Sequence, residues 1–182
     1  MSQKALFLDR DGVIIDVVFE GGWLMTCRSV EEVRVIIGVK EALDKLKAMG
    51  YLLIVVTNQP NVARGEMAIA DVEAVHNRLR DEFKLPIDAY YYCPHDTSEN
   101  CSCKKPKIGL IIDQAMRDFP IIDLKQSFVV GDREGDMELG RSLGCKTILI
   151  PSPATLWFTK VKPESDMRAK DLLQVCDIIM KS

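Results

Sequence analysis

Five short apolar runs alternate along this chain with segments that repeat apolar residues at helical spacing, and this alternation limits the possible folds more than any other feature. The runs cover residues 5–8, 51–56, 87–92, 127–130 and 147–150. Each is apolar at nearly every position, which is typical of strands buried on both faces of a parallel sheet. The pattern predicts an α/β fold: one Rossmann-like domain over residues 1–182, with helices on both faces of a parallel sheet.

Length, charge and hydropathy exclude several classes of protein. A chain of 182 residues, 47% of them hydrophobic, is long enough to bury the core of one ordinary domain. Its formal net charge of −3, without a basic stripe, argues against a nucleic-acid partner. No apolar run approaches the roughly 20 residues that cross a bilayer, and residues 5–8 are too short for the apolar part of a signal peptide. We therefore expect no membrane partner, a cytoplasmic location and, because no helix shows a second apolar stripe, a monomer.

Polar side chains follow three of the predicted strands. Asp9 and Asp11 come after the first run, Thr57 and Asn58 after the second, and Asp132 after the fourth. Right-handed crossovers place the carboxyl ends of parallel strands at one edge of the sheet, where open α/β folds bind their ligands. The sequence therefore predicts one site that gathers these residues.

The residue types at this edge are those of a phosphoryl-transfer site. Asp9 can attack phosphorus and form an aspartyl-phosphate, while Asp11 protonates the leaving oxygen and then activates water. Mg²⁺ prefers oxygen ligands, and Asp9, Asp132 and the Asp11 backbone carbonyl are the candidates to hold it. The Thr57 hydroxyl and the Lys105 ammonium group are candidate donors to the phosphoryl oxygens. Taken one at a time, these residues also fit a solvated turn, a helix cap and a surface charge.

In their order and spacing, these residues resemble the four motifs of the haloacid-dehalogenase superfamily of phosphatases. The motifs stand here as Asp9-Arg10-Asp11-Gly12, Thr57-Asn58, Lys105, and Gly131-Asp132 with Asp136 four residues further on. The resemblance implies a Mg²⁺-dependent phosphatase in which Asp9 is the nucleophile, Asp11 the acid and base, and Asp132 a second metal carboxylate. It also implies that Asp136 supports Lys105 or the metal. The presence of Asp11 argues against cleavage of carbon–halogen bonds.

Three cysteines and a histidine gather in the segment 93–103. Cys93, His95, Cys101 and Cys103 offer three thiolates and one imidazole, a ligand set that suits tetrahedral Zn²⁺ with no open position. We expect a structural zinc loop that orders a polar segment and delivers Lys105 to the edge of the site. Reduced thiols without a metal are the alternative.

A zinc loop in place of a bulky cap resembles the superfamily branch that contains heptose-bisphosphate and histidinol phosphatases. The sequences Thr57-Asn58-Gln59 and Ala63-Arg64-Gly65 are closer to the heptose side of this branch. The resemblance implies a small phosphorylated sugar as partner, with hydrolysis of the 7-phosphate of D-glycero-D-manno-heptose 1,7-bisphosphate for activated-heptose biosynthesis. Histidinol phosphate or another small phosphomonoester is the alternative substrate, and a zinc-stabilised binding protein without turnover is a third possibility.

The same resemblance implies which residues contact the substrate: Arg10, Gly12, Asn58, Gln59, Arg64, Lys104 and Arg133. Two positions depart from the heptose branch. Pro60-Asn61 replaces Ser-Gly beneath the substrate, and Lys104 replaces an arginine, which keeps the charge but loses the bidentate fork.

Two segments show no clear period. Residues 13–37 are either a lid or specificity element or a surface excursion with a small hairpin. Residues 151–163 are expected to be irregular surface chain.

Overall fold

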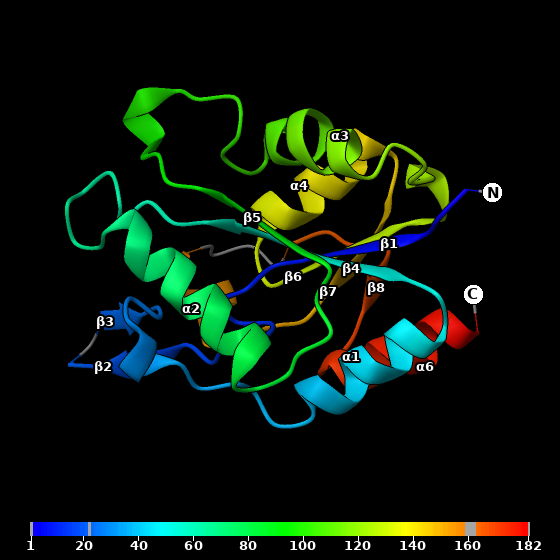
Figure 1. Cartoon of the computed structure of the whole chain (residues 1–182), viewed down its shortest axis with the longest axis horizontal. Coiled ribbons are helices and arrows are strands. Elements are labelled where there is room, and N and C mark those ends of the chain that lie inside the picture. Colours follow the sequence, from blue (N-terminus) through cyan, green and yellow to red (C-terminus); the bar gives the residue numbers. More distant parts are fainter. Residues whose placement is uncertain (1, 22, 159–162, 182) are drawn as a thin grey trace.

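Six parallel strands make the central sheet, in the order β5-β4-β1-β6-β7-β8 (Figure 1). The computed structural model describes residues 2–21, 23–158 and 163–181. The chain builds β4 and β5 on one side of β1 and then β6, β7 and β8 on the other, so the switch point of the sheet lies at β1. The strands are Ala5–Leu8 (β1), Leu52–Asn58 (β4), Ala89–Cys93 (β5), Phe128–Gly131 (β6), Lys146–Leu149 (β7) and Met167–Arg168 (β8).

Helices cover both faces of the sheet (Figure 1). One face carries α1 (Val39–Ala48), α2 (Ile69–Asp81) and α6 (Leu172–Met180). The other carries the π-helical segment η3 (Leu110–Ala115), α3 (Met116–Asp118) and α4 (Glu134–Leu143). Two short 3₁₀ turns, η2 (Thr97–Glu99) and η4 (Leu124–Gln126), lie in the connections.

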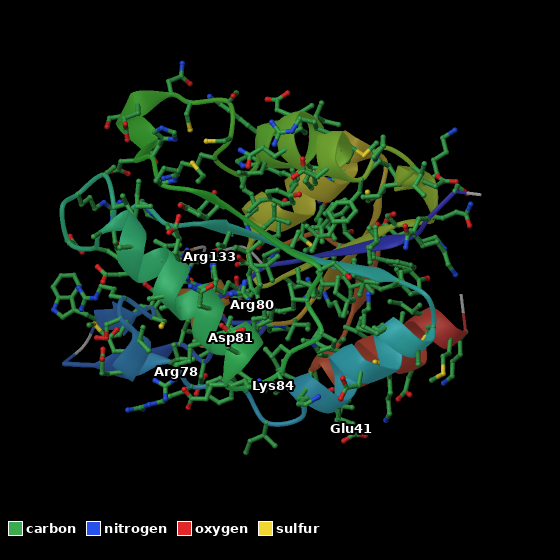
Figure 2. The ribbon with its side chains drawn as sticks, in the orientation of Figure 1. Glu41, Arg78, Arg80, Asp81, Lys84 and Arg133 are labelled. Carbon is green, nitrogen blue, oxygen red and sulfur yellow. The ribbon has the colours of Figure 1, made fainter. Side chains whose placement is uncertain are left out.

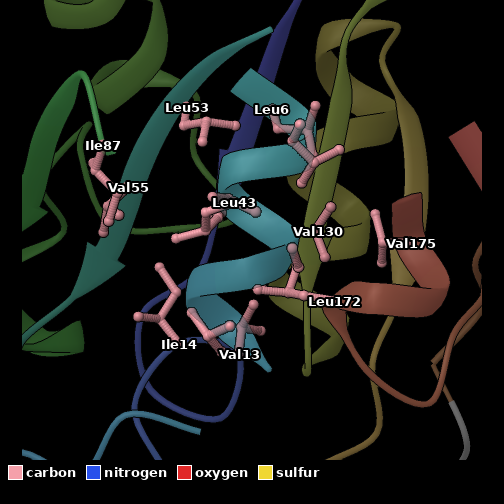
Figure 3. Close-up of a cluster of buried hydrophobic side chains, with 14 of the residues drawn as sticks. Leu6, Val13, Ile14, Leu43, Leu53, Val55, Ile87, Val130, Leu172 and Val175 are labelled. Atoms are coloured by element: carbon pink, nitrogen blue, oxygen red, sulfur yellow. The ribbon is translucent and has the colours of Figure 1, made fainter. Parts of the chain in front are cut away.

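The strands supply the core on both faces because successive side chains point in opposite directions. In β1, Leu6 and Leu8 pack on the side of α1 and α6, whereas Ala5 and Phe7 pack on the side of η3 and α4. Figure 3 shows Leu43 of α1 among the buried side chains of the first cluster. Each fully buried aliphatic side chain of this kind contributes about 1.5–3 kcal/mol, so these two layers hold β1 in place.

This arrangement confirms the predicted α/β fold, as a single domain with a parallel sheet between two helical layers. The five predicted strands lie within two residues of their observed positions. The predicted domain limits, residues 1 and 182, lie outside the described residues. No helix in the described part of the chain combines the length and the apolarity needed to cross a bilayer.

Two elements lie outside the predicted pattern. The edge strand β8 is only two residues long and carries no alternation that a sequence could reveal. Helix α5 (Pro153–Phe158) occupies part of the segment 151–163, which was expected to be irregular; residues 159–162 lie outside the described residues. A proline fits the first helical position because the amide hydrogen that it lacks has no partner there.

Residues 13–37 contain an antiparallel hairpin, which was one of the two alternatives for this segment. It consists of β2 (Val18–Glu20) and β3 (Trp23–Met25), and the 3₁₀ turn η1 (Val30–Glu32) follows it. Arg78 of α2 donates a hydrogen bond to the Val30 carbonyl and so ties η1 to α2 (Figure 2). This bond attaches the segment to the body of the domain.

Candidate active site

A cleft of about 620 Å³ opens at the carboxyl ends of β1 and β4. Asp9 and Asp11, which follow β1, Thr57 of β4, and Lys105 line its inner part. All four side chains are buried, and Asp9 and Lys105 are hydrogen-bonded although they are 96 residues apart in the sequence. The fold thus brings the four predicted catalytic residues to one place.

The Lys105 ammonium group donates three hydrogen bonds. Its acceptors are Asp9 Oδ1 at 2.8 Å, Asp136 Oδ1 at 2.6 Å and the Val56 carbonyl at 2.7 Å. Burial acts to lower the pKa of Lys105, but Asp136 and Asp9 outweigh it and hold this pKa above its ordinary range. Lys105 is therefore a fixed cation beside the carboxylate that is expected to attack phosphorus, where it can offset the charge of a phosphate ester.

Asn58 holds the backbone of Lys105. Its Oδ1 accepts a hydrogen bond from the Lys105 amide at 3.0 Å, and its Nδ2 donates to the Lys105 carbonyl at 3.2 Å. The sequence predicts Asn58 as a substrate contact; in the structure it lines the cleft, but its amide joins β4 to the segment that carries Lys105. Its geometry is that of a residue that positions the lysine.

The Asp11 carboxylate is fixed by two neighbours. Arg10 is fully buried and donates to Asp11 Oδ2 from Nε at 3.2 Å and from Nη2 at 3.0 Å. Gln59 Nε2 donates to the same oxygen at 2.8 Å and to Thr57 Oγ1 at 3.0 Å. Arg10 is not among the described residues that line the cleft, and Gln59 lines it while bonded to Asp11. Both predicted substrate contacts therefore act on the candidate acid and base.

Three carboxylates form a candidate metal site beside Lys105. One oxygen from each of Asp9, Asp132 and Asp136 lies within 4.8 Å of the other two. Asp132 is fully buried, and its Oδ1 accepts no hydrogen bond from the described residues. Burial, with Asp9 and Asp136 close by, raises the pKa of Asp132 to about 8. A buried carboxylate oxygen without a donor, among other carboxylates, fits a site for a hard divalent cation.

Asp136 differs from the other two carboxylates because both of its oxygens are engaged. Oδ1 binds Lys105, and Oδ2 accepts a hydrogen bond from the Arg133 amide at 3.1 Å at the start of α4. This geometry agrees with a supporting role for Asp136, whereas Asp9 and Asp132 have the freer oxygens.

Gly12 and Ser152 shape the surroundings of Asp132. Ser152 Oγ donates a hydrogen bond to Asp132 Oδ2, and Thr155 Oγ1 donates to the Asp132 carbonyl at 2.6 Å. Gly12 has φ = +91°, and a Cβ atom at this position would lie 2.4 Å from Asp132 Oδ2. Gly12 therefore permits the close approach of the β1 exit to Asp132. Ser152 and Thr155 are not among the residues predicted from the sequence. Ser152 before Pro153 is typical of a helix start and could have indicated this helix.

The four predicted zinc ligands converge in the loop after β5. The Sγ atoms of Cys93, Cys101 and Cys103 and Nδ1 of His95 all lie within 4.8 Å of one another. Cys93 Sγ is 3.6 Å from Cys101 Sγ and 3.1 Å from Cys103 Sγ, and His95 Nδ1 is 3.2 Å from Cys103 Sγ. A tetrahedral zinc ion with Zn–S bonds of about 2.3 Å separates its sulfur ligands by about 3.8 Å, so the cluster is close to the required size.

Charged side chains complete the outer part of the cleft. Arg64 and Arg133, both predicted to contact the substrate, line the cleft, and the Arg64 guanidinium binds the Asp96 carboxylate through two contacts of 3.1 Å. Lys104 is directed elsewhere: its Nζ donates to the His95 carbonyl at 3.3 Å and lies 3.7 Å from Asp96 Oδ1. Arg133 stands at the N-cap of α4, 3.6 Å from Asp132 Oδ1 (Figure 2).

The sequence analysis missed one wall of the cleft, because the aperiodic segment 13–37 gave no indication of which side chains point inward. This wall comes from β3 and the residues after it, with one carboxylate from the loop before α2. Its members are Trp23, Leu24, Met25, Thr26, Arg28 and Glu66.

Comparisons with known proteins agree with this geometry. A model of the family described as polynucleotide kinase 3 phosphatase matches residues 20–175. A D-glycero-beta-D-manno-heptose-1,7-bisphosphate 7-phosphatase from Helicobacter pylori is 35% identical over 184 residues, covering 98% of each chain. A D-glycero-alpha-D-manno-heptose-1,7-bisphosphate 7-phosphatase from Mycobacterium tuberculosis is 38% identical over 144 residues, covering 78% of this chain and 73% of the relative.

A solved structure matches the fold over nearly the whole chain. The crystal structure of D,D-heptose 1,7-bisphosphate phosphatase from B. bronchiseptica, complexed with magnesium and phosphate, superposes with a TM-score of 0.82 at 27% identity. The match covers 98% of this chain and 99% of that chain.

Proposed function

The chain belongs to the polynucleotide kinase 3 phosphatase family within the haloacid-dehalogenase superfamily, and we propose that it hydrolyses the 7-phosphate of D-glycero-D-manno-heptose 1,7-bisphosphate, the activity after which its relatives are named. The observation that carries the proposal is the contact of Lys105 with Asp9 and Asp136, next to Asp132, at the carboxyl end of the sheet. Relatives that align with this chain from end to end and bear the name of this activity support the choice of substrate.

The chain's own residues supply the nucleophile and the acid–base group of a two-step transfer. An Asp9 carboxylate oxygen attacks the phosphorus of the 7-phosphate, and the bond from phosphorus to the sugar oxygen breaks. Asp11 gives its proton to that oxygen, so the sugar leaves as an alcohol. Water then attacks the phosphorus of the aspartyl-phosphate, and Asp11 takes a proton from that water. The bond between phosphorus and the Asp9 oxygen breaks, which releases inorganic phosphate and restores the Asp9 carboxylate.

Positioned donors stabilise the charge that builds on the phosphoryl oxygens during both steps. Lys105 is one such donor, because it already contacts the attacking carboxylate. The Thr57 hydroxyl lines the same part of the cleft and accepts a hydrogen bond from Gln59. The Thr57 hydroxyl proton is therefore available for a hydrogen bond to the phosphoryl group. Arg10 and Gln59 act indirectly, since they orient Asp11.

We propose that Asp9, Asp132 and the Asp11 backbone carbonyl would hold magnesium. The buried Asp132 Oδ1 accepts no hydrogen bond from the described residues, and the three carboxylates Asp9, Asp132 and Asp136 meet there, which supports a cation at this place. When bound, Mg²⁺ neutralises charge on the phosphate and on the carboxylates around it. The solved relative that binds magnesium and phosphate supports this choice of metal.

Zinc is proposed as a structural ion of the loop 93–103. Four soft ligands whose atoms lie within 4.8 Å of one another leave no open coordination position for chemistry. Lys105 lies two residues after Cys103, so a rigid loop fixes the start of the segment that carries the lysine.

A direct comparison of substrates tests the proposed function. The values of kcat/KM are measured with Mg²⁺ for both anomers of the heptose 1,7-bisphosphate and for histidinol phosphate. We expect the higher value for one heptose anomer, and a higher value for histidinol phosphate would contradict the proposal. No Mg²⁺-dependent phosphate release from any of these substrates or from an aryl phosphate would instead indicate a binding protein.

A further inference from the structure

Arg28 is a cation in the cleft wall that the proposed chemistry does not use. It lies just after β3 and lines the cleft together with Glu66. Its Nη1 is 3.6 Å from Glu66 Oε2, beyond hydrogen-bond distance, and the two side chains are 34% and 48% exposed. An ion pair this open contributes little to stability, so the guanidinium group can change partners at small cost.

The backbone on both sides of Arg28 is held firmly. Cys27 is buried, and its carbonyl accepts a hydrogen bond at 3.1 Å from Arg10, the residue that grips Asp11. The Arg28 amide donates to Glu32 Oε2 at 2.8 Å. The turn that follows is tied to α2 by the bond from Arg78 to the Val30 carbonyl (Figure 2). Arg28 is therefore presented from a fixed backbone, which lowers the entropy cost of binding a ligand.

Two other cations of the cleft have closer partners than Arg28 has. Lys105 binds Asp9 and Asp136, and Arg64 holds Asp96 through two hydrogen bonds. Arg133 stands beside Asp132 at the reacting end of the cleft. Arg133 Nε and Arg28 Nη1 both lie 3.6 Å from their carboxylates, but Asp132 is fully buried whereas Glu66 is 48% exposed. Among the described cleft residues, Arg28 is therefore the cation whose carboxylate partner is neither within hydrogen-bond distance nor buried, and it lies on the wall formed by β3 and the residues after it.

We infer that Arg28 binds the non-reacting phosphate of a sugar bisphosphate, the phosphate that stays on the product. A second phosphate group in the cleft requires a cation, and a guanidinium group matches phosphate oxygens with two parallel hydrogen bonds. Glu66, next to Arg28, repels a phosphate but can accept hydrogen bonds from sugar hydroxyls. The pair thus selects a ligand that carries an anion and hydroxyls together. The inference rests on the proposed function, because it needs a bisphosphate substrate.

The test compares a bisphosphate with the corresponding monophosphate. The values of kcat/KM are measured for heptose 1,7-bisphosphate and heptose 7-phosphate with the wild type, Arg28→Gln, Arg28→Lys and Arg34→Gln. Arg34 is an exposed arginine of the same segment that is not among the described residues lining the cleft, so Arg34→Gln controls for loss of charge alone.

We expect Arg28→Gln to lower kcat/KM for the bisphosphate about 10- to 100-fold, the size of one lost charge-assisted contact, and to change the monophosphate value less than about twofold. Arg28→Lys should recover part of the loss, and Arg34→Gln should match the wild type. An equal loss on both substrates, or no loss on the bisphosphate, would overturn the inference while leaving the proposed function intact. A wild type that hydrolyses histidinol phosphate but neither heptose phosphate would overturn both.

Discussion

Replacing Lys105 by Met removes the cation shared by Asp9 and Asp136 and keeps most of the side-chain volume. At a separation of 2.6 Å and an effective dielectric constant of about 20, the attraction between Lys105 and Asp136 is about 6 kcal/mol before desolvation is subtracted. Removing one partner of a buried pair costs about 3–5 kcal/mol, because the other charge stays buried and unpaired. We expect Lys105→Met to lower the free energy of unfolding by about 3 kcal/mol. It should also lower kcat at least about 100-fold through the lost donor.

A double-mutant cycle tests this reasoning with urea unfolding at fixed pH and Mg²⁺ concentration. Asp136→Asn keeps an acceptor for the Arg133 amide but removes the charge that Lys105 binds. The double variant should be about as stable as Lys105→Met alone, with a coupling energy of about 2 kcal/mol. Lys45→Met is the control, since its pair with Glu41 is exposed and should change stability by less than about 0.5 kcal/mol. Single effects that add to within about 0.5 kcal/mol would refute the assignment of Asp136 as the partner of Lys105.

Three other perturbations have defined outcomes. Cys103→Ser should remove the zinc measured by elemental analysis and should lower Tm and activity together. Cys145→Ser replaces a buried thiol outside the loop and should keep the zinc. Unchanged zinc in Cys103→Ser would contradict the assignment of Cys103 as a zinc ligand. Burial, with Arg10 nearby, lowers the pKa of His76 to about 3. Below about pH 6.5 the unfolded chain therefore binds a proton that the folded chain does not, and the free energy of unfolding falls by about 1.4 kcal/mol for each further unit of pH until about pH 3. His76→Phe should flatten the fall in unfolding free energy between about pH 6 and 4, and parallel curves would contradict this. Gly12→Ala should weaken Mg²⁺ binding in a titration, because the added Cβ would collide with Asp132. Gly50→Ala is the control: with φ = +84° and no atom within 4 Å of its Cβ, it should add backbone strain without changing the Mg²⁺ affinity. Equal Mg²⁺ affinities of the two variants would refute the steric explanation.

The fold was predictable because its signals are local. Each strand of the sheet except β8 is a short run of mostly apolar residues, and polar residues at the end of β4 and just after β1 and β6 mark where these strands end. The convergence of Asp9 and Asp132 then follows from the single edge at which parallel strands finish. The gathering of Cys93, His95, Cys101 and Cys103 was predictable for a similar reason, since these four residues lie within eleven residues of one another.

The direction of individual side chains was not predictable in the same way. Arg10, Asn58 and Gln59 belong to motifs at the strand ends, but only the fold reveals that they bind Asp11 and the Lys105 backbone. Arg28 lies in a segment without periodicity, so nothing in the sequence distinguishes it from a solvated arginine. Such contacts depend on how distant segments pack, which periodicity and motif spacing do not encode.

The most direct test of the central claim is to trap the phosphoryl group on the enzyme. The reaction with heptose 1,7-bisphosphate and Mg²⁺ is quenched in acid during turnover, and the peptides are analysed by mass spectrometry. We predict a phosphate adduct on Asp9, absent from Asp9→Asn, a variant that should stay folded and release no phosphate. Turnover by Asp9→Asn near the wild-type rate, or an adduct on another residue, would contradict the claim that Asp9 attacks phosphorus.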